Sequence, residues 1–154
     1  MGIEKLSELE ATGLYVFHGS MNNNIEIFEP RQALSFQKPD GESAVFAASS
    51  IEPAVFMAIL GSRKAAGWDS DKFIPPFGFF IAQSAWNKAH QEQWQGYVYA
   101  LPMEKFIKGN GWVWRSTEKV QPVHKFVVSI EDLPLSITVV TDEDEAAYVS
   151  EHSQ

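Results

Sequence analysis

The chain has 154 residues, 45% of them hydrophobic, which is enough for one domain that buries about 70% of its unfolded surface. Its 12 basic and 20 acidic residues give a formal net charge of −8, which disfavours binding to a nucleic-acid backbone or an anionic membrane. The absence of cysteine excludes disulfides, cysteine-ligated zinc and a thiol nucleophile. Without a secretory pattern or an apolar run of about 20 residues, the expectation is a soluble cytoplasmic protein with no membrane partner.

The first third of the chain predicts a helix and a buried strand. Apolar spacing favours a short helix over residues 3–10 and a strand over residues 14–17, which ends at the turn-forming His18-Gly19-Ser20. Asparagines continue the turn at residues 22–24. Residues 25–43 contain two prolines and an Asp-Gly pair, so we expect an irregular segment there.

A second strand is predicted over residues 44–48, followed by a helix that reaches about Arg63. Ser49 and Glu52 have the spacing of a capping box at the start of that helix. Pro53 is compatible with the first turn, where backbone amides have no intrahelical partner.

The second half of the chain predicts mostly strands. A polar loop over residues 66–76 precedes them, and apolar runs then predict strands at residues 77–81, 96–101, 112–116 and 123–130, with a short helix or loop at 84–93. The fold class is therefore α+β, with a mainly antiparallel sheet and few short helices. We expect a single domain over residues 1–140 and an acidic C-terminal tail over 141–154.

His18-Gly19-Ser20 directly follows a buried strand, a position from which a His ring can enter a cleft. Gly19 allows a ligand to approach the backbone closely, and Ser20 adds a hydroxyl that donates and accepts hydrogen bonds. These groups suit a ligand with an amide and ribose hydroxyls. The alternative is a turn histidine with local hydrogen bonds.

Phe46 and Phe56 lie ten residues apart, one on the second strand and one in the helix that follows it. Two aromatic rings so placed can enclose a flat ring, a contact worth about 1 kcal/mol beyond area burial. The alternative is that both rings belong to the hydrophobic core.

The order of these segments is informative. A strand leads into H-G-S, and a later strand carries F-A-A-S and leads into a helix with a second aromatic. In this order the sequence resembles the ADP-ribosyltransferase superfamily. The closest likeness is to the H-Y-E branch, which includes diphtheria toxin and the poly(ADP-ribose) polymerases. The resemblance implies a split β-sheet and NAD as co-substrate. It also implies transfer of ADP-ribose, with release of nicotinamide, to a macromolecular acceptor, which the net charge suggests is a protein rather than a nucleic acid.

The resemblance also implies roles for individual residues. His18 would bond a ribose hydroxyl, and the backbone of Gly19 would hold the nicotinamide amide. Phe46 stands where the family usually has Tyr and would stack on nicotinamide, with Phe56 as the second aromatic.

The third motif of the family is a Glu at the start of a late strand, which stabilises the positive charge that develops as the glycosidic bond breaks. This sequence has Gly111 at that position, within N-G-W-V-W. Loss of one such electrostatic group typically lowers a rate by about 10²–10³. Glu118, in the next turn, is the candidate replacement, and Glu104 is more distant.

Three hypotheses follow from these residues. The first is an NAD-dependent ADP-ribosyltransferase that uses His18 and Glu118. The second is a catalytically silent module that binds NAD or ADP-ribose, which Gly111 favours. The third is a protein-interaction domain with an unrelated α+β fold and an acidic surface. RNA 2′-phosphotransferases share the superfamily fold, but they need a basic residue set that this chain lacks. No histidine spacing indicates a zinc site.

Overall fold

The computed structural model describes residues 2–35, 38–60, 66–68, 79–109, 113–133 and 138–140. Within them the chain forms three α-helices: α1 (Gly2–Thr12), α2 (Ile51–Ile59) and α3 (Gln83–Gln91). The ten strands are β1 (Tyr15–Ser20), β2 (Arg31–Ser35), β3 (Lys38–Ala48), β4 (Ala66–Trp68), β5 (Phe79–Ala82), β6 (Gln95–Pro102), β7 (Ile107–Lys108), β8 (Val113–Ser116), β9 (His124–Ser129) and β10 (Thr138–Val140). Two 3-10 turns cover Met103–Lys105 and Ile130–Asp132.

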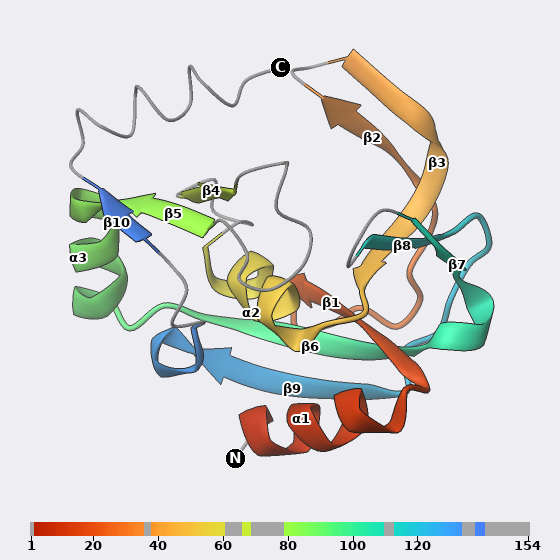
Figure 1. The fold of residues 1–154 in the computed structure, drawn as a ribbon, viewed down its shortest axis with the longest axis horizontal. Coiled ribbons are helices and arrows are strands. Elements are labelled where there is room, and N and C mark those ends of the chain that lie inside the picture. Colours follow the sequence, from red (N-terminus) through yellow and green to blue (C-terminus); the bar gives the residue numbers. More distant parts are fainter. Residues whose placement is uncertain are drawn as a thin grey trace.

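The strands form two sheets (Figure 1). The larger has seven strands in the order β7-β8-β3-β1-β6-β9, with β2 paired to β3, and all its pairs are antiparallel. The smaller has the order β10-β5-β4, with β10 parallel to β5. The predicted α+β class with a mainly antiparallel sheet is confirmed.

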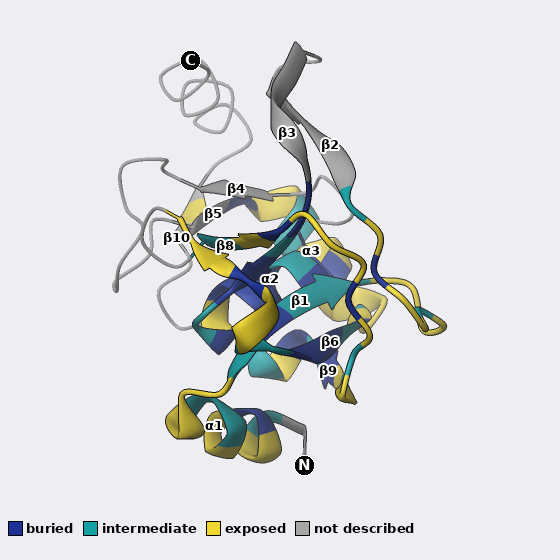
Figure 2. Cartoon of the chain, turned by 90° about the vertical axis from the view of Figure 1, so that its right-hand side faces the viewer, coloured by how far each residue is buried: buried dark blue, intermediate teal, exposed yellow. Residues whose placement is uncertain are grey.

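Two hydrophobic cores lie on opposite faces of the large sheet, because neighbouring residues of a strand point to opposite sides. Phe17 of β1 and Val98 of β6 pack with the helices, whereas Val16 and Tyr99 pack in a second cluster with Phe28. Figure 2 shows the buried residues in dark blue at the centre of the molecule, with the largely exposed or half-buried α1 at its lower edge. The predicted strands at 14–17 and 96–101 correspond to the inner strands β1 and β6, and the one at 123–130 corresponds to β9 at the edge of the sheet. Strand β1 continues through His18-Gly19-Ser20, which were expected to form a turn, because these residues pair with β6.

Helix α2 lies almost against the backbone of β1 and β6. A Cβ atom added at Gly19 would be 2.0 Å from the carbonyl oxygen of Ala54, and one added at Gly96 would be 2.1 Å from that of Ala58. Nearly every side chain of α2 is buried, as expected of a helix that is apolar all round. Glycine at both strand positions is therefore required by helix-on-sheet packing.

The structure corrects two predictions of irregular segments. Residues 31–35 and 38–43, expected to be irregular, form a β-hairpin, and residues 66–68, expected to lie in a loop, form β4. In each case the backbone hydrogen bonds go to partner strands that local turn signals do not reveal. Strand β10 was not predicted. The expected helix end near residue 63, the loop residues 69–76 and the acidic tail at 141–154 lie outside the described residues.

The described helices include none that is long and apolar enough to cross a membrane.

Replacing Gly19 or Gly96 by Ala should destabilise the fold. The added methyl group meets backbone that cannot rotate away, and overpacking of this kind costs about 1–3 kcal/mol. The expected fall in Tm is about 2–12 °C, measured by thermal denaturation. Ser20→Ala, the neighbouring position, is the control and should change Tm by less. A Gly96→Ala variant as stable as the wild type would show that α2 can move away from the sheet at no cost.

Candidate functional site

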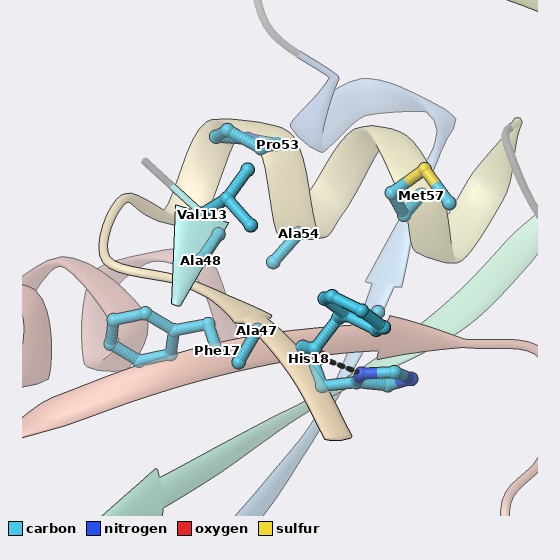
Figure 3. A pocket seen from close by; sticks show the side chains of 10 residues that line it. Phe17, His18, Ala47, Ala48, Pro53, Ala54, Met57 and Val113 are labelled. Atoms are coloured by element: carbon cyan, nitrogen blue, oxygen red, sulfur yellow. Dashed lines mark hydrogen bonds between the residues drawn. The ribbon is translucent and has the colours of Figure 1, made fainter. Parts of the chain in front are cut away.

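The site begins where two central strands part. Strand β1 pairs with β6 along its whole length, from Tyr15 to Ser20, but its described register with β3 consists of one pair, Phe17 with Ala48. Beyond that pair the His18 side chain bridges the strands, with its Nδ1 atom 2.6 Å from the carbonyl oxygen of Phe46 (Figure 3). The H-G-S and F-A-A-S segments are thus directly joined.

This hydrogen bond fixes the tautomer of His18. A carbonyl oxygen only accepts hydrogen bonds, so Nδ1 carries the proton and donates. In the neutral ring Nε2 is then the acceptor, able to receive a hydrogen bond from a hydroxyl group.

A first cavity of about 400 Å³ lies between the parting strands and α2. Pro53, Ala54 and Met57 line it from the helix, and His18 lies across from them (Figure 3). The lining is almost entirely apolar, and its remaining members are Phe17, Gly19, Phe46, Ala47, Ala48 and Val113. Such a cavity suits a flat, uncharged ring system.

A second cavity of about 320 Å³ lies on the Phe28 side of the same histidine. His18 and Phe46 line both cavities. The second is more polar, because its lining includes Ser20, Asn22 and Glu29; the other members are Ile25, Ile27, Phe28, Ala44 and Val45. His18 therefore separates an apolar site from a polar one.

The predicted residues divide between these sites. His18, Gly19 and Phe46 line the first cavity, and Ser20 lines the second, where its Oγ accepts a hydrogen bond from the Asn22 amide at 3.0 Å. The side chain of Phe56 is 0% exposed within the core and lines neither cavity, so the structure does not bring it to Phe46. Because α2 is buried on nearly every side, an aromatic residue in it does not by itself indicate a ligand.

Glu118 is exposed in the turn after β8 and lines neither cavity. Its amide donates to Ser116 Oγ at 3.2 Å. Gly111, the position of the family's Glu, lies outside the described residues. The carboxylate that sequence reasoning missed is Glu29, which lines the second cavity and forms an exposed ion pair with Lys119 at 3.5 Å.

The described residues contain no group of three or more His, Asp or Glu side chains that could hold a metal ion.

The start of α2, which supplies Pro53 and Ala54 to the first cavity, is capped from another helix. Ser50 occupies the N-cap position and makes no side-chain capping bond, so the predicted Ser49–Glu52 capping box is wrong. Instead Glu10 of α1 accepts a hydrogen bond from the Ile51 amide at 2.8 Å. A carboxylate at this place also meets the positive end of the helix dipole.

Comparison with known proteins finds no family model, no curated protein and no solved structure that matches the chain.

Glu52→Gln should raise Tm at pH 7. Partial burial, and then repulsion from Glu10, raise the pKa of Glu52 above its ordinary value of 4.5. The folded state therefore binds this proton more tightly than the unfolded state, and stability is lost as pH rises through the folded pKa. The gain in the variant should shrink as pH falls below 4.5, when the wild-type carboxyl is protonated in both states.

The measurement is Tm against pH for both proteins, with Glu8→Gln on the exposed side of α1 as control. A Glu52→Gln variant that is less stable than the wild type at pH 7 would contradict the unfavourable placement of this carboxylate.

Proposed function

We propose that this chain is an ADP-ribosyltransferase-like domain that binds NAD across the two cavities on either side of His18. The observation that carries the proposal is the hydrogen bond between His18 Nδ1 and the Phe46 carbonyl oxygen. It joins the two segments in which the sequence resembles the family, and it does so at the boundary between the cavities.

The division of the site suits a dinucleotide, which has two ring systems joined by ribose and phosphate groups. Each cavity falls within, or at the lower end of, the range of about 300–1,000 Å³ found for small-molecule sites. The apolar first cavity would take the nicotinamide ring against Phe46. The second would take the adenosine half, whose hydroxyl and amino groups find partners at Ser20 and Asn22.

The tautomer of His18 supports the same assignment. Since Nδ1 donates to Phe46, Nε2 of the neutral ring is an acceptor suited to a ribose hydroxyl. The strand holds the imidazole in place, so the orientation is set before a ligand arrives. Gly19 contributes to the wall of the first cavity, although helix packing alone already explains its lack of a side chain.

The described lining of the first cavity contains no carboxylate, which favours NAD binding over NAD cleavage. Transfer of ADP-ribose to a protein is the second candidate. One observation favours it: β8 pairs with β3, so Glu118 follows the strand adjacent to that of Phe46. In such a reaction the bond from the ribose to nicotinamide breaks, a bond to the acceptor nucleophile forms, and a nearby carboxylate stabilises the intervening positive charge.

NAD should raise the Tm of the protein. At one hundred times Kd, binding to the native state alone contributes about 2.7 kcal/mol, or about 5–10 °C for a chain of this size. His18→Ala removes the bridge between the strands and the acceptor for the ribose, and should weaken binding at least about tenfold. His90→Ala, on the exposed side of α3, is the matched control. No Tm shift with millimolar NAD would reject the proposed function.

Release of nicotinamide from labelled NAD separates the two candidates. Release that falls by about 10²–10³ in Glu118→Gln, with the exposed Glu8→Gln of α1 as control, would identify a transferase in which Glu118 stabilises the charge. Tight binding without release would identify a silent NAD-binding module.

A further inference from the structure

We infer that Tyr99 is a positioning residue for the proposed NAD site: its hydroxyl holds the segment of residues 21–29 in place as the wall of the second cavity. The inference rests on the proposed function, and it concerns a residue that lies outside both cavities.

Tyr99 lies on β6 directly opposite His18 of β1. Directly opposed residues of antiparallel strands point to the same face of the sheet, so both side chains face Phe28. Tyr99 is 1% exposed, and its side chain is one of the largest that are fully buried. A phenol in such a place needs partners for its hydroxyl group.

The partners of that hydroxyl are both backbone groups of the 21–29 segment. Tyr99 Oη donates to the carbonyl oxygen of Asn22 at 2.5 Å and accepts from the amide of Ile25 at 3.3 Å. Asn22 and Ile25 both line the second cavity. The Tyr99 hydroxyl thus holds two backbone groups of the cavity wall, both more than 70 residues from Tyr99 in the sequence.

The ring of Tyr99 also supports His18, through the ring of Phe28 that lies between them. Phe28 packs edge-on against Tyr99, with ring centroids 5.2 Å apart, and edge-on against His18 at 4.7 Å. Phe28 is itself held by two backbone hydrogen bonds with Val120, of 2.8 and 2.9 Å. The wall and the imidazole are therefore positioned by one connected set of contacts.

A further anchor of the segment is at the surface. Lys125 Nζ donates to the backbone oxygen and to Oδ1 of Asn23, each at 2.8 Å. These bonds are exposed, and water can replace them at small cost. The buried phenol is the anchor whose loss should change the shape of the cavity.

Tyr99→Phe tests the inference, because it keeps the ring against Phe28 and removes only the hydroxyl. Tyr97→Phe is the matched control: it removes a hydroxyl from the same strand and keeps the ring beneath Lys125. We expect Tyr99→Phe to raise Kd for NAD and for ADP-ribose by about fivefold to tenfold, with Kd for nicotinamide alone unchanged. Tyr97→Phe should leave all three constants at their wild-type values.

Amide hydrogen exchange provides a readout that is independent of NAD. In Tyr99→Phe the Ile25 amide loses its acceptor and should exchange at least about tenfold faster, while the amides of Phe28 and Val120 keep their rates. An unchanged Ile25 rate would overturn the inference, and so would an equal loss of affinity for NAD and for nicotinamide, which would indicate general loosening. If the wild type binds no NAD, the proposed function fails, and the Ile25 rate still decides whether Tyr99 holds the segment.

Discussion

The close approach of α2 to the backbone of β1 and β6 is the constraint on which the rest of the structure depends. With glycine at positions 19 and 96, two helix carbonyl groups occupy the space that strand side chains would otherwise fill. Interiors are packed so densely that a helix cannot withdraw by one methyl group without disturbing every neighbour. The distance of α2 from the sheet also determines the helix-side wall of the first cavity, which is lined by Pro53, Ala54 and Met57. Folding and the candidate site share the same contacts.

The parting of β1 and β3 provides the second requirement, an opening within an otherwise continuous sheet. A strand that loses its neighbour leaves backbone polar groups without their usual partners, which is costly in a buried place. Here the side chain of His18 satisfies the Phe46 carbonyl oxygen. The same ring is left between two cavities of different polarity, a position in which it can contact both halves of an extended ligand.

The elements that could be predicted from the sequence are those whose signal is local. Runs such as Gly96 to Leu101 are apolar and end at a proline, and the structure has a strand there. The β2–β3 hairpin could not be predicted in the same way, because its residues carry turn signals and gain their order from pairing with each other. The start of α2 is capped by Glu10, which lies 41 residues before Ile51 in the sequence. No capping pattern within the helix reveals such a contact.

The residues of the candidate site also divide into those that have a local sequence signal and those that depend on tertiary contacts. His18, Gly19 and Phe46 follow from motif and position, and they lie together at one cavity. Phe56 was chosen by its spacing from Phe46 and by the family resemblance, and neither says which side of an apolar helix faces a ligand. Phe28 and Tyr99 carried no local signal, since their importance comes from meeting His18 across the sheet. Residues that support a site from behind are defined by the tertiary fold.

The order of strands in the large sheet has a consequence for the synthesis of the protein. Strand β1 carries the proposed NAD-binding histidine, yet it lies in the sheet between β3 and β6, so its ladder is complete only when the chain has reached Pro102. The contacts of Phe17 with α2 can form before β6 has been synthesised, whereas the pairing of β1 with β6 spans a long stretch of chain and such distant pairings form slowly. The histidine therefore takes its final place in the sheet later than its position near the start of the sequence suggests.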